Sequence, residues 1–91
     1  FREAQPDTPV ILVAKPDAER GAGGDRRRGI IRETYRNAIA RGDKNVAFVD
    51  GRELFGDLRE ECTVDGCHPN DIGFYRMAEV IGNAVDTALK L

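Results

Sequence analysis

A short apolar run rich in β-branched residues at positions 9–14, and a second short run with an apolar centre at positions 45–50, limit how this chain can fold. Runs of this length are typical of strands that are buried on both faces of a parallel sheet. Between them, residues 25–41 carry apolar side chains at intervals of three and four, which predicts an amphipathic helix. These apolar positions are Ile30, Ile31, Thr34, Tyr35, Ala38 and Ile39. The order strand, helix, strand predicts a parallel βαβ unit.

The ends of this first helix are predicted from capping residues. Asp25 is a suitable N-cap, and Gly42 suits the position just after the last helical residue. Residues 15–25 contain Pro16 and three glycines, which predicts a loop before the helix.

The second half of the chain predicts one further helix. We expect a short helical turn at residues 51–55 and a long loop at residues 56–70. Asn70 or Asp71 can then cap a final helix that runs to near Lys90. Its apolar stripe consists of Met77, Val80, Ile81, Ala84, Val85 and Ala88.

Two strands and two helices form an incomplete α/β domain. A two-stranded sheet is marginal, and a parallel sheet needs cover on both faces. We therefore expect residues 1–91 to be the C-terminal fragment of a single three-layer α/β/α domain, whose N-terminal half supplies further strands.

The composition does not favour binding to nucleic acid or to a membrane, and it lacks serine. The net charge is −2, so no overall basic character favours nucleic acid or an anionic membrane. Arg26, Arg27 and Arg28 form the one basic run, which we interpret as solvated. No apolar run reaches the 18 or so residues of a transmembrane helix. The sequence contains no serine.

The single histidine, His68, is the strongest candidate for chemistry. It lies in Asp65-Gly66-Cys67-His68-Pro69-Asn70, just before the last predicted helix. Imidazole titrates near neutral pH and can therefore take up and return a proton. Asp65 lies three residues earlier, and in a turn this spacing can bring its carboxylate within hydrogen-bond reach of the ring. The alternative is a surface histidine at a helix start beside a turn aspartate.

The wider string Thr63-Val64-Asp65-Gly66-Cys67-His68-Pro69-Asn70-Asp71-Ile72-Gly73-Phe74 resembles the last motif block of the SGNH hydrolase superfamily, the GDSL lipases and acylhydrolases. That block reads Asp-x-x-His-Pro, followed by a polar pair, a glycine and an aromatic residue. The two apolar runs and the intervening helix also resemble the family's order of elements. The resemblance covers most of the chain, although only the final block is specific.

The resemblance implies a flavodoxin-like α/β/α sandwich and hydrolysis of an ester through an acyl-enzyme, without a cofactor. In such enzymes a serine attacks the carbonyl, a histidine matched by His68 acts as base and then acid, and an aspartate matched by Asp65 orients it. The substrate would be an acetylated sugar, a lipid or another small ester. An extracytoplasmic or secreted location is compatible with the family, whereas the residues leave the compartment open.

The sequence departs from the family because the serine, glycine and asparagine blocks are absent. Only Asp65 and His68 match, so the isolated chain is expected to be inactive and to depend on the remaining N-terminal part of the domain. The alternative is a non-catalytic α/β module that binds a ligand or a partner on the same scaffold.

Other conspicuous residues have simpler interpretations. Cys62 and Cys67 could form a disulfide or remain reduced, and their spacing does not predict a metal site. The glycines of residues 21–24 predict a flexible connection, which could line a substrate entrance. Asp50 is expected to cap the turn after the second strand. Phe74 or Tyr75 could border an acyl pocket, whereas the other aromatic residues are expected to pack.

Overall fold

A computed structural model describes residues 1–16, 22–65 and 67–89 of the chain. The elements in chain order are β1 (Val10–Val13), α1 (Ala22–Ala40), β2 (Val46–Val49), the 3₁₀ helices η1 (Gly51–Glu53) and η2 (Gly56–Cys62), and α2 (Asp71–Leu89). The strands are parallel, in a register that pairs Val10 with Val46 and Val13 with Val49.

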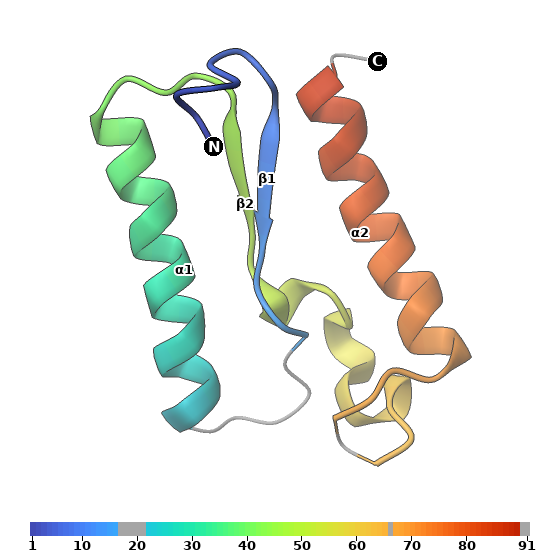
Figure 1. The fold of residues 1–91 in the computed structure, drawn as a ribbon. Helices are drawn as coiled ribbons and strands as arrows, with labels where there is room; N and C mark the ends of the chain where they lie inside the picture. The colour runs from blue at the N-terminus through green and yellow to red at the C-terminus, as the bar shows by residue number, and fades with distance from the viewer. Residues whose placement is uncertain (17–21, 66, 90–91) are drawn as a thin grey trace.

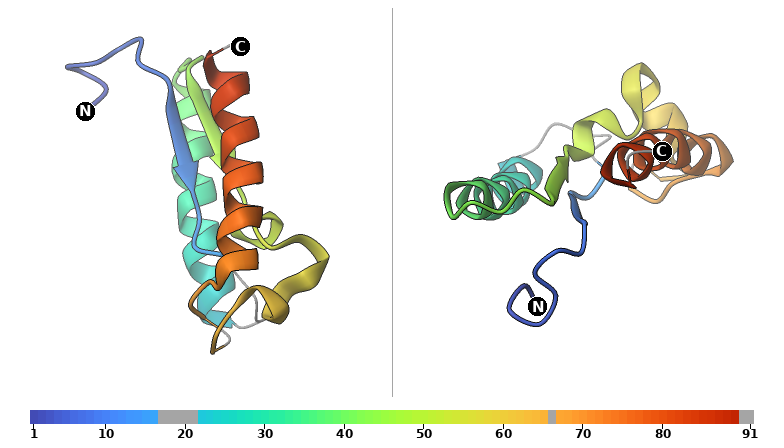
Figure 2. Two further views of the ribbon diagram at one scale, coloured as in Figure 1. Left: turned by 90° about the vertical axis from the view of Figure 1, so that its right-hand side faces the viewer. Right: turned by 90° about the horizontal axis from the view of Figure 1, so that it is seen from above.

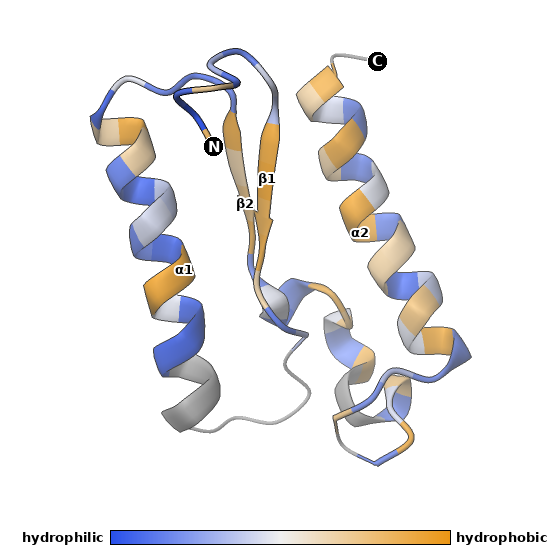
Figure 3. Cartoon of the chain, viewed as in Figure 1, coloured by the Kyte–Doolittle hydropathy of each residue, from blue (hydrophilic) through white to orange (hydrophobic). Residues whose placement is uncertain are grey.

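The two helices cover opposite faces of the two-stranded sheet, which gives three layers (Figures 1 and 2). Each helix contacts both strands. Figure 3 shows that the strands are apolar, that α2 carries many apolar residues, and that α1 is mainly hydrophilic. The predicted α/β architecture with a parallel strand pair is therefore confirmed.

The burial of the strands differs from the prediction. Most strand residues are half-buried, and Val13 is exposed, whereas we expected burial on both faces. One helix on each side of two strands leaves part of the strands uncovered. The best-buried side chains, Leu54, Phe55 and Cys62, instead lie in the segment that follows β2. Leu58 and Met77 pack against this cluster.

The prediction of a long loop at residues 56–70 is wrong for its first half. Residues 56–62 form the 3₁₀ helix η2, which contacts α2. Phe55 and Cys62 are fully buried at its two ends, and this burial fixes the path of the chain. Neither residue belongs to a run with helical or strand periodicity, so the pattern gave no signal for η2.

Helix α1 differs from its prediction at the start and in its buried face. It begins at Ala22, so Asp25 lies within the helix and is not its N-cap. Ile30 and Ile39 were expected to face the core, but they are 60% and 47% exposed. Arg28 is buried instead, because it reaches a carboxylate at the end of β2.

The predicted helix ends after α1 and before α2 are confirmed. Gly42 has a φ of 90° and donates its N–H to the carbonyl of Ile39, while Asp43 donates to Ala38. This is the Schellman arrangement, and its left-handed residue favours glycine. At the start of α2, the Asn70 side chain accepts a hydrogen bond from Gly73 N–H, as an N-cap does.

Candidate active site

The Asp65–His68 turn lies at the carboxyl edge of the sheet, the end toward which both strands run (Figure 1). Open α/β sheets place their sites at this edge. Thr63 and Pro69 form an antiparallel bridge at the base of the turn, and Val64 N–H donates to the carbonyl of His68 at 2.9 Å. The turn is thus a short hairpin between η2 and α2. Gly66 lies outside the described residues.

The carboxylate of Asp65 organises this hairpin. Its Oδ1 accepts hydrogen bonds from the backbone N–H groups of Cys67, at 2.9 Å, and His68, at 2.7 Å. Its Oδ2 lies 2.6 Å from Nδ1 of the His68 ring. These contacts, the backbone N–H of His68 first among them, lower the pKa of Asp65 from 3.8 to about 2. The carboxylate is therefore ionised throughout the neutral range.

The same contact assigns roles to the two ring nitrogens of His68. When Nδ1–H donates to the ionised Asp65, the lone pair of the neutral ring lies on Nε2. The side chain of His68 is 76% exposed, and that of Asp65 is 50% exposed. Both side chains are therefore accessible from solvent. The structure thus brings together the two residues that the sequence singled out.

A sequence profile of the GDSL-like lipase/acylhydrolase family matches residues 1–86 of the chain. The chain belongs to this family. A crystal structure of a Bacteroides ovatus protein described as a GDSL-like lipase matches 98% of the chain, with a TM-score of 0.79 and 30% sequence identity. The chain spans 28% of the length of that protein. A comparison with curated protein sequences found no match.

Family membership confirms the resemblance carried by the final motif block. It also agrees with the parallel α/β fold, which the B. ovatus structure shares. The family that the chain belongs to is described as one of GDSL-like lipases and acylhydrolases. Among the described residues of this chain, no helix is long and apolar enough to cross a bilayer.

A second charged cluster of the GDSL-like chain lies at the end of β2. Asp50 accepts a hydrogen bond from the backbone N–H of Arg52 and so caps η1, as predicted. Its carboxylate also lies 2.8 Å from the Arg52 guanidinium, 2.9 Å from that of Arg32 and 3.5 Å from Nε of Arg28. These contacts, led by the Arg52 side chain, lower the pKa of Asp50 to about 2.

The basic run of the sequence is therefore only partly solvated. Arg26 and Arg27 are exposed as expected, but Arg28 is 6% exposed and joins α1 to the end of β2. Sequence reasoning missed this cluster. The four-residue spacing of Arg28 and Arg32, which places both on one side of a helix, was the available signal.

The two cysteines differ sharply in environment. Cys62 is fully buried, with its Sγ 3.8 Å from the carbonyl oxygen of Phe55, and Cys67 is exposed. Both are free thiols in this structure, which favours the reduced alternative. Within the described ranges, no three His, Cys, Asp or Glu side chains are close enough to hold a metal ion.

Aromatic residues follow two patterns. Tyr35 and Phe48 stack between α1 and β2 with ring centroids 6.0 Å apart, and Phe55 is fully buried, as expected for packing residues. Phe74 and Tyr75 are 59% and 67% exposed on the first turn of α2. They follow His68 closely in sequence.

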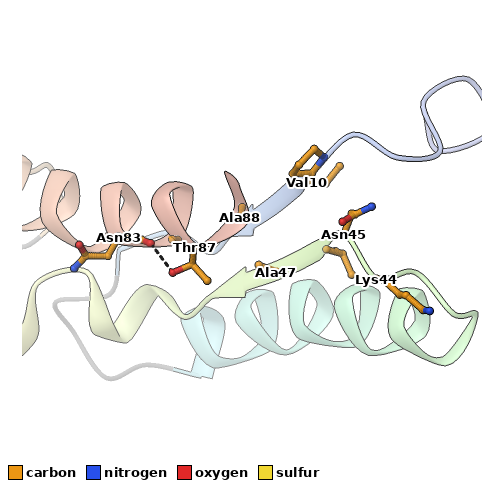
Figure 4. A pocket seen from close by; sticks show the side chains of 10 residues that line it. Val10, Lys44, Asn45, Ala47, Asn83, Thr87 and Ala88 are labelled. Carbon is orange, nitrogen blue, oxygen red and sulfur yellow. Dashed lines mark hydrogen bonds between the residues drawn. The ribbon is translucent and has the colours of Figure 1, made fainter. Parts of the chain in front are cut away.

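A groove of about 450 Å³ lies at the opposite end of the sheet (Figure 4). Val10 and Asn45, near the start of the strands, face Thr87 and Ala88, near the end of α2. Because His68 lies at the carboxyl edge, this groove is not part of the Asp65–His68 site. Of the glycine-rich segment 21–24, residue 21 lies outside the described residues, and residues 22–24 are helical rather than a flexible loop.

Proposed function

We propose that Asp65 and His68 are the orienting acid and the general base of a Ser-His-Asp triad that hydrolyses an ester. The observation that supports this best is the 2.6 Å contact between Asp65 Oδ2 and His68 Nδ1. The other carboxylate oxygen accepts hydrogen bonds from two backbone N–H groups, so the orientation of the carboxylate does not depend on the ring alone. The family assignment supports the same chemistry.

The sequence contains no serine, so the nucleophile of the proposed triad is supplied from outside these 91 residues. His68 Nε2 takes the serine hydroxyl proton as the oxygen attacks the ester carbonyl, and then gives that proton to the leaving alcohol. Water then attacks the acyl carbon as His68 takes a proton from it, the bond between the acyl group and the serine oxygen breaks, and His68 returns the proton to that oxygen. Ionised Asp65 stabilises the imidazolium formed in each half of the cycle.

The remaining part of the domain would also complete the substrate pocket. We propose that Phe74, which is exposed on the first turn of α2, forms one apolar wall for the acyl group of the substrate. Acetylated sugars, lipids and simple small esters are the candidate substrates.

The test uses the complete protein that contains this chain, assayed with a short-chain chromogenic acetate ester. The His68→Ala form should lose nearly all turnover, whereas Asp86→Ala, an exposed change near the far end of α2, should not. Near-normal turnover in the His68→Ala form would show that the assignment is wrong. A complete protein that hydrolyses no ester in an acyl-length series would favour the non-catalytic module instead.

A further inference from the structure

The Asp65 and His68 side chains are exposed, so packing alone does not determine the orientation of the His68 ring. With side chains 50% and 76% exposed, neither residue is held by packing. A general base must nevertheless point its reacting nitrogen at one place, because displacement of about 1 Å can cost 10²-fold in rate. Its orientation must therefore come from the backbone of the hairpin and from whatever anchors that hairpin to the fold.

Asn70 is the residue at which the hairpin joins α2. Its backbone N–H donates to the carbonyl of Cys62 at 2.8 Å, which closes the base of the hairpin. Its side-chain Oδ1 accepts from Gly73 N–H at 2.9 Å. Its side-chain Nδ2 donates to the carbonyls of Glu61, at 2.8 Å, and Thr63, at 3.3 Å. One side chain therefore connects the helix start with the arm that leads into the turn.

This set of contacts needs a short side chain that both accepts and donates. Serine and aspartate accept at an N-cap as well as asparagine does. An aspartate, however, has no donor for the carbonyls of Glu61 and Thr63, and it would place an anionic oxygen against them. Serine is shorter and carries one O–H. Helix capping therefore does not account for the two hydrogen bonds that Asn70 Nδ2 donates.

We propose that Asn70 is a positioning residue, whose carboxamide links α2 to the arm before the turn and so holds the Asp65–His68 pair in its working orientation. This inference rests on the proposed function of His68. Asn70 does not touch the substrate and acts through the hairpin. Losing the link should loosen the turn without weakening the start of α2.

The experiment compares Asn70→Ser and Asn70→Asp in the complete protein, since both substitutions keep an N-cap. Asn83→Ser, an exposed change in the middle of α2, is the matched control. For each form, kcat and KM are measured with the acetate ester, folding is checked by thermal unfolding, and the Asp65 carboxyl is titrated by NMR. That titration reports the turn itself and does not depend on turnover.

In folded Asn70→Ser, kcat should fall by about 10- to 100-fold while KM stays near the wild-type value. The pKa of Asp65 should rise from about 2 toward its usual 3.8, because the N–H groups of Cys67 and His68 are no longer held against it. If the serine form does not fold, the aspartate form is used for the same comparison.

A wild-type kcat, or a lowered kcat with an unchanged Asp65 pKa, would overturn the inference. Failure of both forms to fold would do so as well, because Asn70 would then be needed for the fold itself. Failure of the proposed function gives a different result, namely turnover that survives His68→Ala.

Discussion

Gly73 lies directly against the carbonyl oxygen of Cys62, so close that a Cβ atom in its place would overlap that oxygen. The same carbonyl accepts the hydrogen bond from Asn70 N–H at the base of the Asp65–His68 hairpin. The first turn of α2 and the end of η2 are therefore packed backbone to backbone. Glycine at position 73 sets how closely the helix that follows His68 sits on the core.

This packing predicts that Gly73→Ala destabilises the protein. The added methyl group must displace backbone, and overpacking of this kind costs about 1–3 kcal/mol. Gly82→Ala on the same helix is the control, because nothing lies within 4 Å of its Cβ position. Alanine there should stabilise the helix by up to about 1 kcal/mol. Urea unfolding of both forms measures the difference, and equal stability would contradict the prediction.

Much of this architecture could be predicted from the sequence. Both strands are marked by short apolar runs, and both long helices by apolar residues at intervals of three and four. Gly42 and Asn70 mark helix ends through local chemistry, which needs no knowledge of the rest of the fold. The spacing of Asp65 and His68 is likewise local, and the structure brings the two side chains together.

The features that could not be predicted depend on contacts between distant residues. On α1, Arg28 is buried, and both Arg28 and Arg32 reach Asp50 across 22 and 18 positions of sequence. Because helical periodicity assigns arginines to solvent and isoleucines to the core, it predicted that Ile30 is buried, whereas Ile30 is exposed. The hydrogen bonds that the Asn70 side-chain N–H₂ donates also lie outside the local capping pattern, because their acceptors are carbonyls in η2 and in the arm before the turn.

Asp50→Asn should lower the free energy of unfolding near neutral pH. The substitution removes the carboxylate that Arg28, Arg32 and Arg52 share, and the loss of hydrogen bonds between charged groups of this kind costs about 1–3 kcal/mol. Urea unfolding at pH 7 measures this loss. Asp86→Asn, an exposed position on α2, is the control and should change stability little.

The pH dependence of that loss checks its electrostatic origin. The folded-state pKa of Asp50 is about 2, below the usual 3.8, so its contribution is complete above pH 4–5 and is lost as pH falls toward 2. The difference between wild type and Asp50→Asn should shrink over that range. A difference that stays constant from pH 7 to pH 2 would mean that the carboxylate charge is not its source.

The two thiols should react at very different rates. Cys67 is exposed and should be alkylated rapidly in the folded protein, whereas buried Cys62 should react only when the region around η2 opens. Peptide mass spectrometry after a timed exposure to N-ethylmaleimide distinguishes the two sites. Equal labelling of both, or a Cys62–Cys67 disulfide in an unreduced digest, would contradict the structure.

Asp65→Asn should separate the charge of Asp65 from its role in shaping the turn. An asparagine Oδ1 can still accept from the N–H groups of Cys67 and His68, but the side chain no longer stabilises an imidazolium. If the proposed triad is correct, kcat in the complete protein should fall by about 10²- to 10⁴-fold. His68→Ala should lower it at least as far, because the base itself is lost.

The pH profile gives the corresponding test without a substitution. With a pKa of about 2, Asp65 stays ionised down to strongly acidic pH, so its protonation should not limit kcat above about pH 4. An acid limb present in the wild type should therefore arise from another group. If Asp65→Asn retained the wild-type kcat, the 2.6 Å contact with His68 would have no catalytic consequence, and Asp65 would be a turn residue only.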